Sequence, residues 1–350
     1  MIHKKYPFLL FIFFLLVEFA AAQELIGPHG YLTFEAEIGN KDSVSRRGTF
    51  DLHHFNLLGN YLINPQARVF GEIEWEHGAD TEEEEAGRSF GIVRIERAWF
   101  EYAFLTKFKL RFGKFLTPYG IYNEIHDAAP AFDTSILPRS IYGQHENPFG
   151  DSQKFYSKFS LGVQALGTFD YRGAQFKYQI FLANGRGDNA FEQDDNSDKA
   201  FGLRIQSDIP GMGLKLGYSF YTGKNGLAEN TRQTSHAWDL RFEFNKLRIS
   251  GEYAHSILDN GNTAARGLRA NAIYGEIAYH IFGRQSLLVR YDIFDSDRQI
   301  SNDLEKDFTI ATSLQIIHQV VAKAEVHFWY VENAPRTNYI LAIASLAVIF

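Results

Sequence analysis

The sequence predicts an all-β protein, namely a transmembrane, antiparallel, up-and-down β-barrel of about sixteen strands. Three observations predict this fold. Segments of about ten residues alternate between apolar and polar side chains along the chain. The connections between these segments are alternately short and long. Beyond Val17, no stretch approaches the roughly 18 apolar residues that a membrane-spanning helix needs.

The composition is that of a strand-rich chain. The 350 residues include 32 Phe and 18 Tyr but only 2 Met, and aromatic side chains favour strands. There is no Cys, so disulfides do not staple the fold. The net charge is −7 and Lys and Arg are not clustered, so nucleic acid is not an expected partner.

The first 22 residues have the pattern of a secretory signal peptide. Lys4 and Lys5 form a basic start, Phe8–Val17 is an apolar segment of about ten residues, and Ala20–Ala22 is a small-residue cleavage site. The apolar segment is too short to span a bilayer. We therefore expect residues 1–22 to be removed and residues 23–350 to form one barrel domain in the bacterial outer membrane.

The rest of the chain divides in order into alternating segments, each followed by a turn or a loop. The first places Leu32, Phe34, Ala36 and Ile38 on one face, and the others repeat this pattern, although the second and fourteenth alternate poorly. The predicted strands are His29–Gly39, Thr49–Ile63, Ala67–His77, Ile92–Leu105, Phe108–Leu116, Phe155–Asp170, Ala174–Ala183, Ala200–Asp208, Leu214–Tyr221, Ala237–Phe244, Leu247–Ile257, Arg269–Ile281, Ser286–Phe294, Asp307–Ile317, Ala322–Val331 and Thr337–Phe350.

Loop lengths indicate a membrane setting. Short turns fall at residues 64–66, 106, 171–173, 209–213, 245–246, 283–284 and 318–319, and longer loops separate them. In an up-and-down barrel this places the short turns on one rim and the long loops on the other, as in outer-membrane barrels. A closed sheet also satisfies every backbone hydrogen bond in hydrocarbon.

The two faces of the strands differ in polarity. One face is charged along its length. The other suits lipid, with aromatic side chains near the strand ends; its members include Phe176, Tyr178, Ile180, Leu182, Leu214, Leu216, Tyr218, Phe220, Trp238, Leu240, Phe242, Phe244, Val326, Phe328 and Tyr330.

One long loop interrupts the pattern between the fifth and sixth strands. Alternation stops at Thr117–Gly120, and about 35 residues follow in which nothing resembles a strand. The segment is too rich in Ile, Phe, Tyr and Pro to be a solvated linker. We expect it to fold into the lumen as a constriction loop, with Ala128–Tyr142 occupying the lumen. Its predicted site residues are Glu124, Asp127, Asp133 and Arg139.

The charged face predicts an uneven lumen wall. Acidic side chains dominate the first and third strands. Basic side chains, with no acid between the strand ends, dominate strands five to nine; this basic arc consists of Lys109, Arg111, Lys158, Lys177, Arg204 and Lys215. The acids of the constriction loop could face the basic arc across a narrow opening, and rings of Lys and Arg favour anions.

The carboxyl end carries a family resemblance. A final alternating strand that ends on Phe350 resembles the assembly signal of Gram-negative outer-membrane porins, and Leu110–Glu124 (LRFGKFLTPYGIYNE) is similar to a strand and loop of phosphate-selective porins of the O/P type. The resemblance implies a water-filled channel for passive diffusion of small hydrophilic or anionic solutes, with phosphate among the candidates. It also implies barrel assembly machinery that reads Phe350, outer-membrane lipid and lipopolysaccharide as surroundings, a possible homotrimer and no cofactor.

Two other classes remain open. One is an outer-membrane barrel enzyme, a protease or phospholipase, although no G-x-S-x-G motif is present and the neighbours His53 and His54 should point to opposite faces of a strand. The other is a structural or adhesion barrel with a plugged lumen. We predict no enzyme activity. We also predict no metal site, because the acids near Asp194 lack the Gly and terminal Glu of a calcium loop.

Overall fold

The computed structural model describes residues 25–42, 45–76, 92–125, 131–143, 145–146, 152–153, 155–185, 197–224, 232–259, 267–281, 284–332 and 338–350. The predicted signal peptide, the predicted site residue Asp127 and the acidic segment around Asp194 lie outside these residues. Within the described ranges, no helix combines the length and the hydropathy needed to cross a membrane.

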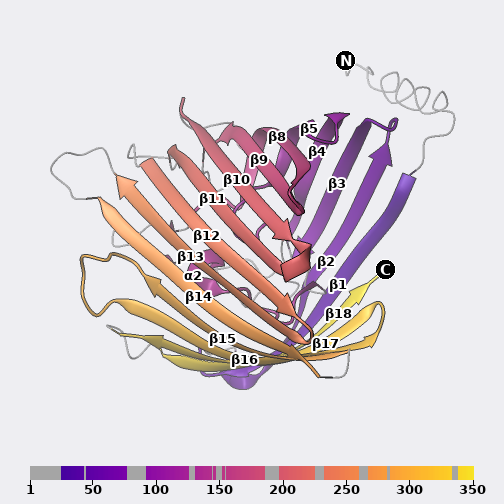
Figure 1. Ribbon diagram of the computed structural model, residues 1–350. Helices are drawn as coiled ribbons and strands as arrows, with labels where there is room; N and C mark the ends of the chain where they lie inside the picture. Colours follow the sequence, from indigo (N-terminus) through magenta and orange to yellow (C-terminus); the bar gives the residue numbers. More distant parts are fainter. Residues whose placement is uncertain are drawn as a thin grey trace, which may run out of the picture.

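Sixteen strands form a closed antiparallel barrel, which confirms the predicted fold class (Figure 1). Each strand pairs with its neighbours along the chain. The barrel strands are β1 (Leu25–Gly39), β2 (Thr49–Leu62), β3 (Ala67–Glu76), β4 (Ile92–Leu105), β5 (Phe108–Leu116), β8 (Phe159–Tyr171), β9 (Ala174–Asn184), β10 (Lys199–Ile209), β11 (Leu214–Lys224), β12 (Arg232–Phe244), β13 (Leu247–Asp259), β14 (Leu268–His280), β15 (Gln285–Asp295), β16 (Leu304–Ile317), β17 (Val320–Val331) and β18 (Tyr339–Ile349).

Short elements lie between the barrel strands. Two 3-10 turns, η1 (Ser45–Arg47) and η3 (Pro210–Met212), follow β1 and β10. The long loop between β5 and β8 contains one helical turn, α2 (Arg139–Tyr142), and a two-stranded pair, β6 (His145–Glu146) and β7 (Ser152–Gln153). The sixth barrel strand is therefore β8.

The barrel closes between its first and last strands. β1 and β18 are paired from Tyr31 opposite Ile349 to Gly39 opposite Leu341. Beyond this ladder, Gly30 N donates to Phe350 O over 2.8 Å and Phe350 N donates to Gly30 O over 2.9 Å. Closure leaves no free strand edge in the membrane, which is the condition for a β-sheet to be stable there.

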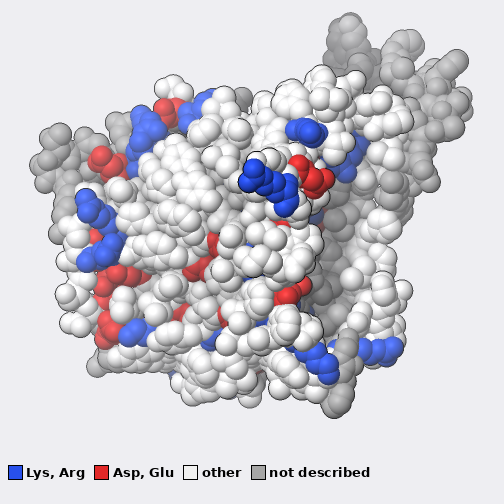
Figure 2. Space-filling model, viewed as in Figure 1, with Lys and Arg blue, Asp and Glu red and all other residues white. Residues whose placement is uncertain are grey.

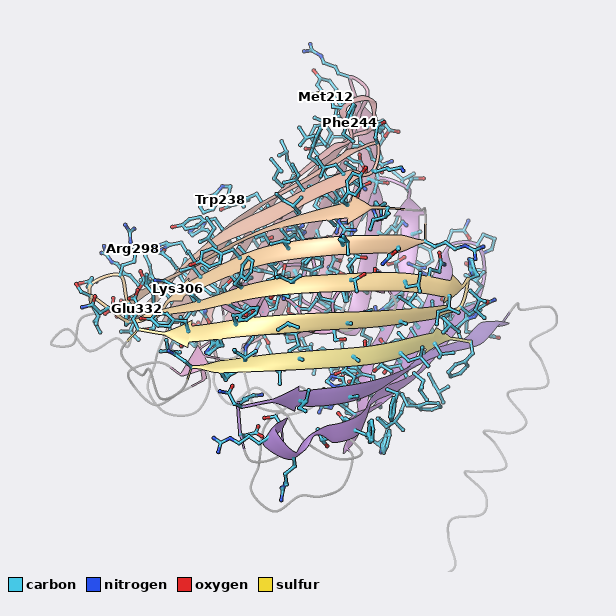
Figure 3. All side chains as sticks on the ribbon, turned by 90° about the horizontal axis from the view of Figure 1, so that it is seen from below. Met212, Trp238, Phe244, Arg298, Lys306 and Glu332 are labelled. Atoms are coloured by element: carbon cyan, nitrogen blue, oxygen red, sulfur yellow. The ribbon has the colours of Figure 1, made fainter. Side chains whose placement is uncertain are left out.

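The predicted alternation of faces is clear in β14. Ala272 and Tyr274 point inward and are buried, whereas Ile273 and Ile277 point outward and are about half exposed. Trp238 likewise points away from the barrel interior (Figure 3). In Figure 2 most of the visible surface is neither acidic nor basic. The outward face therefore has the apolar character that lipid requires.

Turn chemistry fits the short rim. At the turn between β8 and β9, Arg172 has φ 51° and Gly173 has φ 82°. Two consecutive residues with positive φ form a type I′ turn, whose twist matches the twist of the two strands that it joins in a β-hairpin.

The predicted start of the sixth strand at Phe155 is wrong, because β8 begins at Phe159 and Lys158 precedes it.

A bulge in β2 alters the alternation on the wall formed by β1–β4. In β2, Thr33 pairs with His54 and Phe34 with Leu52, so His53 is an extra residue. The rings of His53 and His54 lie 4.1 Å apart, and both contact lumen carboxylates. The expectation that these two histidines face opposite ways is therefore wrong, because a bulge adds a residue without reversing the face.

Candidate channel lumen and its inward loop

The segment from Thr117 to Lys158, called the inward loop here, leaves β5 and enters the barrel. Its root is fixed by polar contacts: Thr117 Oγ1 lies 2.7 Å from Ser160 Oγ, and Asn123 Nδ2 donates to Thr117 O over 2.6 Å and to Lys158 O over 3.1 Å. Asn123 therefore ties the two ends of the loop together where they leave the wall.

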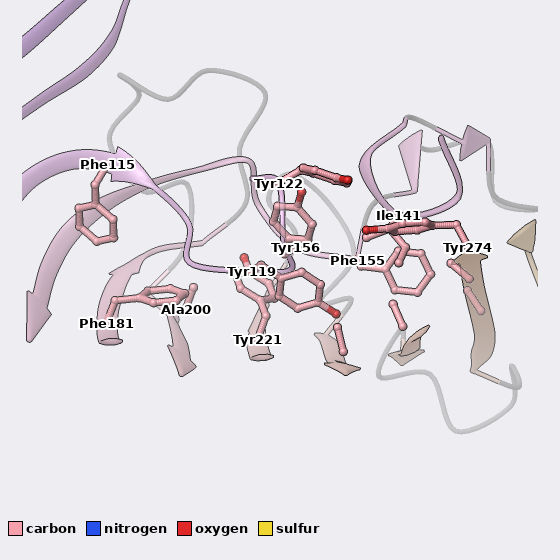
Figure 4. Close-up of a cluster of buried hydrophobic side chains, with 14 of the residues drawn as sticks. Phe115, Tyr119, Tyr122, Ile141, Phe155, Tyr156, Phe181, Ala200, Tyr221 and Tyr274 are labelled. Atoms are coloured by element: carbon pink, nitrogen blue, oxygen red, sulfur yellow. The ribbon is translucent and has the colours of Figure 1, made fainter. Parts of the chain in front are cut away.

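An aromatic cluster holds the inward loop against the wall (Figure 4). Tyr119 stacks on Tyr156 within the loop, with ring centroids 4.3 Å apart, and Tyr122 stacks on Tyr274 of β14 at 6.2 Å. The cluster also contains small wall residues, which leave room for these rings: Ala183, Ala200, Ala237, Ala254, Ala270 and Ala272. Burial of aromatic surface at this scale contributes several kcal/mol, of the order of 2 kcal/mol for each ring.

Wall carboxylates accept hydrogen bonds from loop backbone. Glu325 of β17 accepts from Ser135 N over 2.8 Å and from Ile136 N over 3.0 Å. Asp292 of β15 accepts from Ser140 N over 3.2 Å, at the start of α2. Because both carboxylates are buried, these bonds compensate charges that would otherwise be costly in the interior.

Two loop tyrosines bond to carboxylates farther around the wall. Tyr142 OH donates to Glu252 Oε2 of β13 over 2.6 Å, and Tyr122 OH donates to Glu276 of β14. Burial raises the pKa of both phenols, with the neighbouring carboxylate adding to the shift. Both hydroxyls therefore stay protonated and serve as donors.

Basic wall residues bind the middle of the loop. Arg248 of β13 pairs with Asp133, whose other oxygen accepts from Ser313 Oγ of β16 over 2.6 Å. Lys323 Nζ donates to Thr134 O over 3.0 Å. Although burial alone would raise it, the pKa of Asp133 is held below its ordinary value by Arg248. The predicted site residue Asp133 is thus an anchor of the loop.

The structure distributes the basic arc unevenly. Four of its members have acidic partners: Arg111 with Glu101 (2.7 Å), Lys177 with Glu124 (3.3 Å), Arg204 with Asp239 (2.8 Å) and Lys215 with Asp208 (3.1 Å). Lys109 is half-buried on β5, and Lys158 lies in the loop over the ring of Phe159.

Only part of the predicted juxtaposition of loop acids and basic arc is present. Glu124 meets Lys177, and this partner holds the pKa of Glu124 below its ordinary value despite burial. Asp133 instead contacts β13 and β16, and Arg139 donates to Tyr339 OH over 3.0 Å and stacks on Trp329. The loop reaches past the basic arc because its anchors lie on β13–β18.

The wall of β3–β5 carries a row of stacked arginines that sequence reasoning missed. The guanidinium groups of Arg68 and Arg111 lie 5.0 Å and 4.1 Å from the ring centroid of Trp99, and that of Arg97 lies 4.8 Å from the ring centroid of Phe70. Glu101 accepts from both Arg68 and Arg111. The signal was available, since Trp99 shares the face of Arg97 and Glu101.

Phe350 lies outside the lumen. Its ring is half exposed on the outer surface and stacks on Phe55 of β2, with centroids 5.9 Å apart. The backbone of Phe350 completes the ladder to Gly30 described above. The residue therefore belongs to the closing seam.

Comparisons with known proteins agree with this architecture. The family model described as phosphate-selective porin O and P matches residues 66–303. An uncharacterized protein of Aquifex aeolicus (strain VF5) is 34% identical over 118 residues, which are 33% of this chain and 25% of that protein. The chain thus matches only a quarter of the length of this relative.

Solved structures with a similar fold are porins and outer-membrane proteins. An anion-selective porin from Comamonas acidovorans superposes with a TM-score of 0.68 at 12% identity, covering 94% of this chain and 100% of that one. OmpT of Vibrio cholerae gives 0.65 at 10% identity, with coverages of 94% and 98%. The in-vitro folded trimer form of that OmpT gives 0.61 at 10% identity, with coverages of 94% and 100%. These likenesses establish the barrel fold.

Proposed function

Because the chain belongs to the phosphate-selective porin O and P family, we infer that it forms a water-filled channel in the bacterial outer membrane for passive diffusion of small hydrophilic solutes. The observation that carries this proposal is a closed barrel of sixteen strands whose inner face is charged and hydrogen-bonded along its length. A barrel of this strand number encloses an aqueous lumen.

The inward loop supports a definite route for solutes. Its hydrogen bonds named above attach it to β8, β9 and β13–β18, so it lies on that side of the lumen. We propose that solutes pass between the loop and the wall of β1–β5. A constriction made by a loop on a rigid wall sets both size and charge selection.

Single-channel recording tests the channel directly. The purified barrel in a planar bilayer should give discrete, reproducible conductance steps, whereas protein heated to unfold it should give none. A folded barrel that produces no steps would contradict the proposal and favour a plugged structural or adhesion barrel. Hydrolysis of peptide or phospholipid by the same preparation would favour an enzyme instead.

Preference for anions is the finer part of the proposal. It is supported by the gathering of six basic side chains, the basic arc, on one side of the barrel, although Arg111, Lys177, Arg204 and Lys215 each also pair with an acid. Fields in the lumen are screened over about 8 Å at physiological salt, so only lysines near the constriction matter. Lys158 and Lys177 lie beside the inward loop.

A charge-reversal experiment tests this preference. The triple variant Lys109→Glu, Lys158→Glu, Lys177→Glu should shift the reversal potential in a salt gradient toward cations. The control Lys246→Glu changes a rim lysine at the turn between β12 and β13 and should leave the reversal potential unchanged. An unaltered reversal potential in the triple variant would show that the arc only keeps the lumen wet.

Assembly as a homotrimer belongs to the same proposal. Its support is the apolar outer face, together with the trimer form in which OmpT of Vibrio cholerae is described. Cross-linking in outer-membrane vesicles should capture a species of three chains. Recovery of monomers alone at every cross-linker concentration would contradict it.

A further inference from the structure

A histidine and two carboxylates meet on the lumen wall of β2 and β3, which run side by side (Figure 1). His54 Nδ1 lies 2.9 Å from Glu74 Oε1, and one donor atom each of His54, Glu74 and Glu76 lie within 4.8 Å of one another. We propose that these three side chains bind a divalent transition-metal ion, for which Zn²⁺ is the natural probe.

The strand register builds this group. His54 is directly opposite Glu76 in the antiparallel pair, and Glu74 lies two residues earlier on the same face of β3. Directly opposed side chains have Cβ atoms about 5 Å apart, which suits ligands converging on one ion. Because strands are more rigid than loops, the donors are held in place before an ion arrives.

Donor chemistry selects the class of ion. Imidazole nitrogen with carboxylate oxygens suits Zn²⁺ and related transition metals better than Ca²⁺ or Mg²⁺, which prefer oxygen alone. Bonds of about 2.0–2.2 Å to each donor require donors roughly 3–3.5 Å apart, and the His54–Glu74 pair, at 2.9 Å, is already close to this spacing. Three protein ligands leave a fourth position for water or a solute from the lumen.

Two bulges concentrate further groups at this place. The bulge in β2 brings His53 to the same face as His54, beside Asp51 at 3.4 Å. The second bulge lies between β3 and β4, where Glu72 pairs with Arg97 and Ile73 with Ile95, so Glu96 is the extra residue. Glu96 is buried and interacts with Glu74. Bulges commonly re-aim side chains at functional sites.

The charge of the group also favours a cation. Glu74 and Glu96 are both about 1% exposed on adjacent strands, and burying carboxylates is costly without compensation. Arg94 of β4 supplies one positive charge, through Nη2 at 2.5 Å from Glu76 Oε2, and Lys114 and Lys158 supply two more that act on Glu74. Asn56 Nδ2 donates to Glu74 Oε1 over 3.3 Å and orients it. A bound ion would compete with Arg94 for Glu76.

The surroundings of His327 show that a histidine beside two carboxylates does not by itself form a metal site. Its Nδ1 lies 2.7 Å from Asp307 and its Nε2 lies 3.1 Å from Glu325, so a carboxylate occupies each ring nitrogen on opposite sides of the ring. The donors therefore surround the imidazole instead of converging on one point. At His54, Glu74 and Glu76 they converge.

The proposal is tested by calorimetric titration of the folded barrel in detergent with Zn²⁺, using protein purified without a polyhistidine tag. The wild-type barrel should bind one Zn²⁺ per chain, reversed by a chelator. His54→Gln and, separately, Glu76→Gln should each lower the affinity at least about tenfold, because loss even of outer ligands has effects of this size. Heat-modifiable migration in gel electrophoresis should show that the wild type and each variant are folded.

Two further variants sharpen the test. Arg94→Gln should raise the affinity, because it removes the competitor for Glu76. His255→Gln changes a histidine of β13 that lies 2.8 Å from Asn271 on the outer face, and it should bind Zn²⁺ like the wild type. Absence of saturable binding, or equal affinity in wild type and both ligand variants, would overturn the proposal. Since the readout is binding, this result is independent of conduction.

Discussion

At the scale of single residues, charges inside the barrel are compensated by partners one or two strands away. Arg204 is fully buried, and Asp239 two strands away accepts from its Nη1 over 2.8 Å. Lys215 and Asp208 form a comparable pair at the rim, but there both side chains are more than one third exposed. The two pairs have the same chemistry and differ in hydration.

This difference predicts different costs of mutation. Arg204→Met should lower the free energy of unfolding by about 3–5 kcal/mol, because Asp239 is left buried without a countercharge. Adding Asp239→Leu should restore much of the loss. Lys215→Met should cost less than about 1 kcal/mol, because water replaces the partner. Urea unfolding in lipid vesicles measures all three, and equal costs for Arg204→Met and Lys215→Met would contradict the argument.

The face of the sheet on which a side chain lies could be predicted wherever apolar and polar residues alternate regularly. Arg111 and Arg204 lie on the inner face that period two alone predicts for them. The bulge at His53 could not be predicted, because an extra residue is defined by the partner strand and leaves no mark in its own pattern. The ion pairs between strands could not be predicted either, because they depend on the register between strands.

At the scale of elements, the inward loop is the main departure from a plain barrel. Its existence and its insertion between the fifth and sixth strands were predicted from composition, because apolar and aromatic residues in a long loop need a surface to cover. Its course was not predictable, since its anchors lie on strands distant in sequence, such as β17 and its Glu325.

Shortening the loop should widen the passage. Deletion of residues 128–142 removes α2 and the anchors at Asp133, Ser135 and Ser140, so single-channel conductance should rise. The measurement needs a deletion variant that migrates as a folded barrel before heating. Conductance equal to the wild type in such a variant would place the solute route away from the loop.

Acid should release the loop only at low pH. The pKa values of Glu124 and Asp133 lie below their ordinary values of 4.5 and 3.8, because Lys177 and Arg248 outweigh burial. A lowered pKa stabilises the docked loop above the ordinary pKa, and this is lost as pH falls through the lowered one. The ion pairs of Glu124 and Asp133 should therefore be intact at both pH 7 and pH 5, and their loss should change the conductance only below about pH 4.

The matched variant for this prediction is Glu124→Gln with Asp133→Asn. It removes both charges at every pH, so at pH 7 it should conduct as the wild type does in acid. Conductance of this double variant equal to that of the wild type at pH 7 would contradict the assignment of these two carboxylates as anchors.

The closing strand gives the second prediction at this scale. Deleting Phe350 should lower the yield of folded barrel in the outer membrane, because the residue directly follows β18 and its backbone bonds to Gly30. Phe350→Tyr retains the ring that stacks on Phe55 and should preserve the yield. Heat-modifiable migration of membrane fractions measures the folded share, and full yield after the deletion would contradict this role.

At the scale of the whole molecule, the chain is polar on average yet presents an apolar exterior. Its mean hydropathy is −0.24, because half of each strand lines a charged interior. That inversion, with the segregation of loop lengths, is why the barrel and its strand number could be predicted from sequence. The position of the solute route could not, because it depends on which wall the loop covers.

The attachment of the inward loop has a consequence for the order of assembly. The loop is synthesised before β8, but Ser135 bonds to Glu325 and Ser345, which follow it by 190 and 210 residues. This part of the loop cannot finish docking until the last two strands arrive, so the completion of docking and the closure of the seam become a single late event. The barrel is thus never closed before the last anchors of the inward loop are present, because β17 and β18 both complete the wall and bind the loop.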